Sequence, residues 1–131
     1  MLRFSSKISF MSKACRGIRG AITVDVNQEE DILLASHELL VEMLSKNDVD
    51  QQDIVSIFFS VTKDLDQAFP AKAARQMGLL DTPLLCLNEI DVENGLKKCI
   101  RLLIHVNSNK DQASIKHCYL KGAIVLRPDL K

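Results

Sequence analysis

The residues of this sequence with the clearest chemical potential are basic side chains in apolar surroundings. Arg101 lies inside an apolar run, Arg19 stands between an isoleucine and a glycine, and Arg127 follows the apolar residues AIVL. Lys72 and Arg75 follow a Phe-Pro pair. A guanidinium is costly to bury without an anion, so an inward-pointing arginine usually meets a carboxylate of the protein or of a ligand.

Each of these positions also has a more ordinary interpretation. A single arginine in a strand more often lies at an edge or on a solvent-facing surface than against a ligand. Taken alone, Glu89 is typical of a salt-bridge partner and Tyr119 of a core residue with a satisfied hydroxyl. Cys86 and Phe69 are typical of packing residues. Only the convergence of several such residues favours a site.

The sequence contains no pattern typical of a reactive nucleophile, a phosphate loop, a dinucleotide fingerprint or a metal site. Its three histidines show no pairing with an acid or a nucleophile, and its four cysteines form no CxxC pair. Positive charge in an apolar setting, without a nucleophile, predicts a site that binds a small polyanion without metal or cofactor.

In the first half of the chain, the patterns predict two strands and one long helix. Residues 16–25 and 54–61 are β-prone, and the second segment is expected to be largely buried. Asn27 resembles an N-cap, with Glu30 three residues later, as in a capping box. The apolar stripe of the helix that follows has a 3.6-residue period and comprises Ile32, Ala35, Leu39, Leu40, Met43 and Leu44.

In the second half, a short helix is expected after Pro70, with Gly78 as its stop. Further strands are expected at residues 84–90, 97–106 and 123–126, and a short helix at 111–119. The predicted fold is a single α/β domain (an α+β mixed sheet) with five strands and one long helix. One sheet face is then poorly covered, which favours a closed, cyclic homo-oligomer.

Composition narrows the function further. The chain has 131 residues, with 17 basic and 17 acidic side chains, so no overall field favours nucleic acid or a membrane surface. Its apolar runs are too short to cross a bilayer. We expect residues 1–13 to be a disordered N-terminal extension, residues 14–131 to form the domain, and the thiols to stay reduced in the cytoplasm.

Six sequence blocks resemble the AroH class of monofunctional chorismate mutases, in order and at that family's spacing. The blocks are RGIRGA (16–21), FPAKAAR (69–75), CLNEID (86–91), GLKKCIR (95–101), HCYL (117–120) and VLRPDL (125–130). The resemblance implies a pseudo-α/β-barrel homotrimer with active sites in clefts between subunits. It also implies isomerisation of chorismate to prephenate, in phenylalanine and tyrosine biosynthesis, without cofactor or covalent intermediate.

The resemblance also implies roles for individual residues. Arg101 is similar to the cation beside the ether oxygen of the breaking bond, and Glu89, with the Cys86 backbone, to the groups that bind the ring hydroxyl. Together with Arg19, Arg101 and Glu89 are the expected catalytic residues. The implied substrate-binding set is Arg19, Phe69, Lys72, Arg75, Leu84, Leu85, Cys86, Glu89, Arg101, Tyr119, Leu126 and Arg127.

Within this set, Arg19 and Arg127 are similar to residues that meet substrate carboxylates, and Tyr119 to the aromatic at the enolpyruvyl end. Leu85 departs from the family, which often has a small hydroxylated residue there. Two alternatives stay open. One is a catalytically silent trimeric protein that binds carboxylates, as in the architecturally similar reactive-enamine deaminases. The other is a structural subunit whose arginines form salt bridges between copies.

Overall fold

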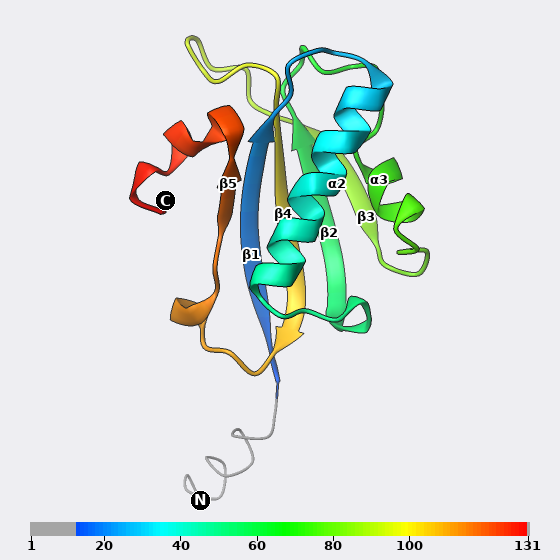
Figure 1. The fold of residues 1–131 in the computed structure, drawn as a ribbon, viewed down its shortest axis with the longest axis vertical. Helices are drawn as coiled ribbons and strands as arrows, with labels where there is room; N and C mark the ends of the chain where they lie inside the picture. The colour runs from blue at the N-terminus through cyan, green and yellow to red at the C-terminus, as the bar shows by residue number, and fades with distance from the viewer. Residues whose placement is uncertain (1–12, 131) are drawn as a thin grey trace, which may run out of the picture.

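The computed structural model describes residues 13–130, and these form one mixed five-stranded sheet with helices on one face (Figure 1). The strand order is β3-β2-β4-β1-β5, with β4 antiparallel to both β1 and β2 and the two outer strands parallel to their neighbours. The elements are β1 (Ala14–Thr23), α2 (Glu29–Lys46), β2 (Ile54–Val61), α3 (Ala71–Gln76), β3 (Leu84–Asn88), β4 (Cys99–Ser108) and β5 (Cys118–Leu120). Short 3₁₀ turns lie at Gln51–Asp53, Gln112–Ser114, Lys121–Leu126 and Pro128–Leu130. The predicted fold class is confirmed.

Helix α2 carries the predicted apolar stripe, and all six of its members are buried against the sheet. Its start differs from the prediction. The cap residue is Gln28, which makes no side-chain capping bond. Asn27 instead binds Asp66 in the loop after β2, through its amide nitrogen at 2.8 Å and its amide oxygen at 3.1 Å. The capping box is therefore absent because Asn27 is used in a contact between distant segments.

The alternation predicted for β4 is confirmed. Ile100, Leu102, Ile104 and Val106 are buried beneath the helices, whereas Arg101 and its neighbours on the other side point to the opposite face. Strand β2 also alternates, so the prediction that it is largely buried was wrong. Its residue Phe58 is 38% exposed on the face opposite the helices.

The prediction fails in the C-terminal quarter. The helix expected at residues 111–119 is a single 3₁₀ turn at Gln112–Ser114, followed directly by β5. The strand expected at 123–126 is part of a 3₁₀ helix that packs beside β1. A short apolar run does not distinguish strand from helix, and Lys121, with a φ of 53°, turns the chain out of the sheet.

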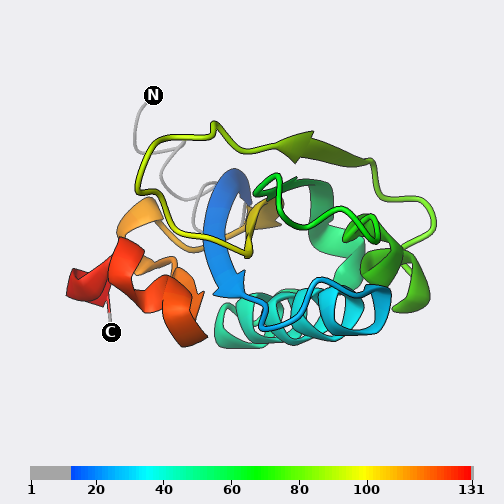
Figure 2. The same ribbon diagram turned by 90° about the horizontal axis from the view of Figure 1, so that it is seen from above.

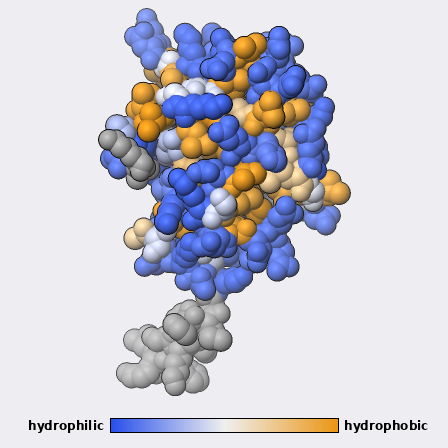
Figure 3. Space-filling view, viewed as in Figure 1, coloured by the Kyte–Doolittle hydropathy of each residue, from blue (hydrophilic) through white to orange (hydrophobic). Residues whose placement is uncertain are grey.

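The sheet has one covered and one open face. Figure 2 shows α2 and α3 together on one side of the sheet. The outer surface of that side is mostly hydrophilic, with separate apolar patches (Figure 3). On the open face, the cross-strand register places Leu85, Phe58, Leu103 and Arg19 in one row. An apolar row of this kind on a sheet face is typical of a surface that another molecule covers.

Within residues 13–130, no helix is long and apolar enough to cross a membrane. The predicted N-terminal extension lies outside the described residues, except for Lys13. That side chain forms an ion pair with Asp53 at 2.9 Å. The domain boundary at residue 14 stays a prediction.

Candidate active site

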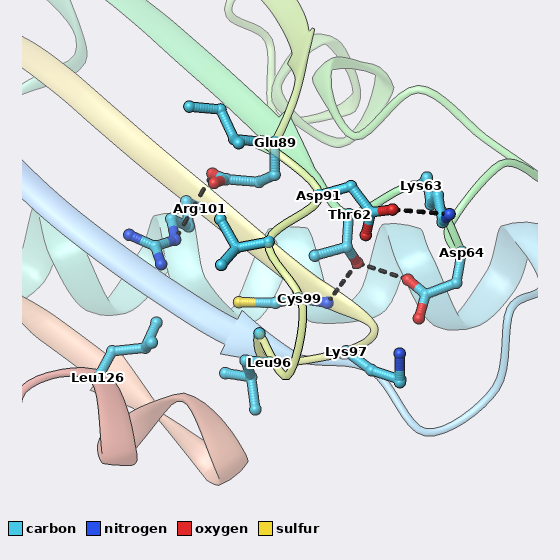
Figure 4. Close-up of a pocket in the computed structure, with 13 residues that line it drawn as sticks. Thr62, Lys63, Asp64, Glu89, Asp91, Leu96, Lys97, Cys99, Arg101 and Leu126 are labelled. Carbon is cyan, nitrogen blue, oxygen red and sulfur yellow. Dashed lines mark hydrogen bonds and ion pairs between the residues drawn. The ribbon is translucent and has the colours of Figure 1, made fainter.

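One cavity brings together three of the predicted site residues. It has a volume of about 370 Å³ and lies where the ends of β2 and β4 meet the loop after β3. Arg101 comes from the open face of β4, Glu89 from just after β3, and Leu126 from the C-terminal 3₁₀ helix. The Arg101 Nε atom lies 3.5 Å from a carboxylate oxygen of Glu89 (Figure 4). We call this space the Arg101 cavity.

Glu89 has a second partner that the sequence analysis missed. The hydroxyl of Ser60 donates to the same carboxylate oxygen that faces Arg101. Ser60 lies directly opposite Arg101 in the β2–β4 register. A serine in an apolar strand is an ordinary residue, so only the strand register identifies it. The Glu89 carboxylate is thus held by two side chains while its exposed fraction stays at 23%.

A second cavity holds four more of the predicted residues. Its volume is about 710 Å³, and its lining includes Phe69, Lys72, Arg75 and Cys86. Lys72 forms an ion pair with Glu29 of α2 at 2.9 Å. Phe69 is 71% exposed as a residue, which is unusual for a large aromatic residue that no partner covers. We call this space the Phe69 cavity.

A third group lies around β1 and β5. The backbone N–H of Arg19 donates to Nδ1 of His117 at 3.0 Å, and Arg127 binds Asp129 through two nitrogens, at 3.1 and 2.9 Å. The hydrogen bonds to Asp129, with a contribution from Tyr119, raise the pKa of the Arg127 guanidinium. Burial, and then the charges of Arg19 and Arg127, lower the pKa of His117.

Two predicted residues lie outside these groups. Leu84 packs against the core beneath the helices. Leu85 points to the open sheet face and is opposite Phe58. Within a single copy, neither lines the Arg101 cavity or the Phe69 cavity. Their predicted contacts with substrate stay predictions.

The nucleophilic side chains near the site do not form a catalytic set. Cys99 lines the Arg101 cavity, but burial raises the pKa of its thiol to about 11, so it is protonated at neutral pH. The sequence patterns did not indicate one further pairing: the Oγ atom of Ser56 lies 3.1 Å from Nδ1 of His105 on the open face. Among the described side chains no carboxylate hydrogen-bonds to this imidazole, so the pair lacks the third group of a triad. Among residues 13–130, no three histidine, cysteine, aspartate or glutamate side chains lie close enough together to hold a metal ion.

The arrangement suits an anionic ligand that is bound without covalent chemistry. Arg101 supplies fixed positive charge beside Glu89, and Arg19 and Arg127 supply further guanidinium groups near His117. Lys72 and Arg75 add positive charge at the Phe69 cavity. Guanidinium groups bind carboxylates through two parallel hydrogen bonds, which fixes the orientation of a ligand as well as attracting it.

Comparison with known proteins identifies the family. The family model described as chorismate mutase type I matches residues 15–130. A chorismate mutase AroH from Bacillus subtilis (strain 168) is 45% identical over 116 residues, which cover 88% of this chain and 91% of that protein. One from Thermus thermophilus is 44% identical over 117 residues, which cover 88% and 96%.

A solved structure agrees with the sequence matches. A chorismate mutase from Clostridium thermocellum superposes with a TM-score of 0.82 at 55% sequence identity, covering 83% of this chain and 97% of that one. A family model that spans nearly the whole described chain leaves no large segment unexplained. The chain belongs to the chorismate mutase type I family.

Proposed function

We propose that this protein isomerises chorismate to prephenate in phenylalanine and tyrosine biosynthesis, with Arg101 and Glu89 at the centre of its active site. The observation that carries the proposal is the ion pair between these residues, at 3.5 Å in a cavity of about 370 Å³. Family membership supplies the substrate, and the cavity supplies the charges that the substrate needs.

The first task of such a site is to fix the shape of a flexible dianion. Chorismate rearranges by a concerted [3,3] shift, in which a carbon–oxygen bond breaks while a carbon–carbon bond forms. No proton is abstracted and no nucleophile is needed. Arg19 and Arg127 are our candidates to bind the two carboxylates, holding the substrate in the chair-like geometry that reacts. Positioning of this kind removes much of the entropic barrier.

The second task is electrostatic. The ether oxygen gains negative charge as its bond to carbon breaks. A guanidinium held beside that oxygen binds the transition state more strongly than the ground state, and this difference accelerates the reaction. Arg101 is the candidate, because its pairing with Glu89 holds the side chain in place before substrate arrives. Glu89 is also the candidate acceptor for the ring hydroxyl.

We further propose that a complete site forms between subunits of a homotrimer. In one copy, three of the predicted residues line the Arg101 cavity and four others line the Phe69 cavity. The strongly exposed ring of Phe69 and the apolar row on the open sheet face both support contact with a second copy. In this arrangement, the Phe69 cavity of one subunit faces the Arg101 cavity of its neighbour.

The test is turnover of chorismate by the purified protein. We expect chorismate absorbance to fall on addition of protein and prephenate to appear in equal amount. A carboxylate-binding protein without activity gives a different result: a bicyclic dicarboxylate analogue raises its melting temperature, but chorismate is not consumed. A structural subunit gives neither response. Chorismate that stays intact in the presence of folded trimer contradicts the proposed function.

We also propose the cytoplasm as the compartment. All four cysteines, Cys15, Cys86, Cys99 and Cys118, lie in the described part of the chain as free thiols. Free thiols at exposed and buried positions alike are typical of a reducing environment. Fractionation of the native cells, followed by a chorismate turnover assay on each fraction, tests this proposal.

A further inference from the structure

The two members of the Glu89–Arg101 pair are held by one short segment that the mechanism does not use. This segment, Val61–Asp64, begins at the last residue of β2 and continues into the loop after it (Figure 4). At its start, the carbonyl oxygen of Val61 accepts a hydrogen bond from the backbone N–H of Glu89 at 2.9 Å. The position of Glu89 therefore depends on where this segment lies.

The other end of the segment holds the start of β4. Both carboxylate oxygens of Asp64 accept from the backbone N–H of Lys98 at 3.0 Å. The Thr62 hydroxyl donates to Asp64 at 2.5 Å and accepts from the backbone N–H of Cys99 at 3.0 Å. Lys98 has a φ of 46°, an unfavourable conformation for a residue with a side chain, so its surroundings must hold it there. Arg101 follows three residues later.

The charge of Asp64 needs an explanation of its own. Asp64 lines the Arg101 cavity, where a dianionic substrate is expected to bind. By its field alone, a carboxylate at this place weakens the binding of a dianion. Its oxygens, however, are occupied by the donors of Lys98 and Thr62. The negative charge of Asp64 in an anion-binding site is therefore consistent with a structural role, in which its hydrogen bonds outweigh its repulsion of the ligand.

We propose that Asp64, together with Thr62, is a positioning residue for the Glu89–Arg101 pair. The inference rests on the proposed function of this site. Asp64 and Thr62 lock the first residues of β4 to the segment that holds Glu89, and so fix the separation of the two catalytic side chains. Small displacements of a catalytic group are sufficient to lower a rate by up to about 100-fold.

Asp64→Asn is the first test, because it removes the charge with almost no change in shape. In Asp64 both carboxylate oxygens accept from the backbone N–H of Lys98. In asparagine an amide nitrogen replaces one of these oxygens, and it cannot accept a hydrogen bond. We expect kcat to fall by about 10- to 100-fold, with a smaller change in KM. The electrostatic alternative predicts the opposite sign, because removing a negative charge should improve binding of the dianion. An Asp64→Asn enzyme with unchanged or higher kcat/KM overturns the proposal.

A pair of Thr62 variants keeps the proposal testable if Asp64→Asn folds poorly. Thr62→Ser retains the hydroxyl and should stay within about threefold of the parent, whereas Thr62→Val should lose rate as Asp64→Asn does. Equal activities for the serine and valine variants contradict the proposal. Asp50→Asn is the matched control. It makes the same charge change at an exposed residue just before the 3₁₀ turn Gln51–Asp53, where the Asp50 side chain makes no capping hydrogen bond. Asp50→Asn should therefore retain the parent rate.

A double-mutant cycle separates positioning from general loosening of the fold. If Asp64 acts through Arg101, Asp64→Asn should cost about 10-fold or more in the parent but less than about twofold in an Arg101→Ala background. An equal cost in both backgrounds contradicts the proposal. If the Arg101→Ala rate is too low, the same cycle is measured on the affinity for a bicyclic transition-state analogue. If the parent protein itself does not turn over chorismate, the proposed function is wrong. Failure of the positioning role is different, because the parent is then active and only the variants depart from expectation.

Discussion

At the scale of single residues, the proposed mechanism makes its strongest demand on Arg101. Its guanidinium must stabilise charge that appears only in the transition state. Arg101→Ala should therefore lower kcat by about 10²- to 10³-fold with a smaller effect on KM. Steady-state kinetics on chorismate measures both constants. Melting curves with and without a bicyclic transition-state analogue verify that the variant keeps its fold and still binds, because Glu89 loses its 3.5 Å partner in this variant.

Replacement of Arg101 by citrulline separates charge from shape. Citrulline keeps the planar group and most of the hydrogen bonds but removes the positive charge. If electrostatic stabilisation is the main effect, citrulline should lose most of the rate, as alanine does. A citrulline enzyme nearly as fast as the parent would show that hydrogen-bonded shape is sufficient, and the role assigned to Arg101 would be wrong.

His117 should make the stability of the protein sensitive to mild acid. Burial and the nearby charges of Arg19 and Arg127 lower its pKa below 6.5, so the unfolded chain binds a proton before the native protein does. As the pH falls below about 6.5, the native state therefore loses stability, and this loss is absent at higher pH. Protonation of Nδ1 also removes the acceptor for the Arg19 N–H.

The measurement is the melting temperature between about pH 7.5 and about pH 5.5. The parent should lose more over this interval than His117→Asn, whose amide oxygen accepts a hydrogen bond at either pH. His37→Asn, which changes an exposed histidine of α2, should behave like the parent. Identical pH slopes for the parent and His117→Asn contradict the role assigned to His117.

The sequence predicts the chemistry of individual residues better than their partners. Arginines in apolar runs indicate an anion site, and the family resemblance suggests a role for Glu89. The hydroxyl of Ser60 on Glu89, the ring of His117 on the Arg19 backbone and the carboxylate of Asp64 on Lys98 all join distant segments. Such contacts depend on which strands pair and in what register, and a single sequence does not reveal this pairing.

At the scale of elements, periodic patterns predicted well and short apolar runs did not. The stripe of α2 and the alternation of β4 reflect burial on one side, which the sequence records directly. The 3₁₀ helix at Lys121–Leu126 has no such period. Its Ala123 is fully buried beside Ala21 and Cys99, whereas Val125 is 63% exposed. Tertiary contacts of β1 and β4 decide this segment, and local sequence does not contain them.

The packing of α2 on β1 gives a test at this scale. A Cβ atom added to Gly20 would lie 2.4 Å from the sulfur of Met43 and 3.1 Å from a methyl carbon of Leu39, both on α2. One added to Gly17 would meet only Leu103, at an ordinary 3.5 Å. Gly20→Ala should therefore lower the free energy of unfolding by about 1–3 kcal/mol through overpacking.

Gly17→Ala is the matched variant, because it makes the same change in the same strand. It should be neutral or slightly stabilising, since alanine restricts the unfolded chain more than glycine does. Urea unfolding at one fixed protomer concentration compares the two, because oligomer stability depends on concentration. A Gly20→Ala protein as stable as Gly17→Ala would show that the helix shifts without cost.

At the scale of the whole molecule, the elements predicted from the sequence and the observed fold both favour self-association. Two helices cover one sheet face, and the other carries Phe58, Leu85 and Leu103 in register. The sequence predicts five strands and only one long helix, so a poorly covered sheet face, and with it the prediction of a partner, follows from the sequence. The identity of the partner could not be predicted in this way, because the hydrophobic effect is non-directional and an apolar face does not specify which molecule covers it.

The last prediction identifies the surface through which copies associate. We expect light scattering to give three times the chain's 14.7 kDa. Phe58→Lys places a charge in the centre of the open face and should dissociate the trimer and abolish turnover, because burial of an unpaired ammonium is costly. Leu34→Lys makes the same change on α2, where the side chain is 63% exposed, and should leave both trimer and turnover unchanged. A parent protein that is monomeric at micromolar concentration contradicts the shared site. A trimer that survives Phe58→Lys but not Leu34→Lys would move the interface to the helix face, and the Phe69 and Arg101 cavities would then have to be completed in another way.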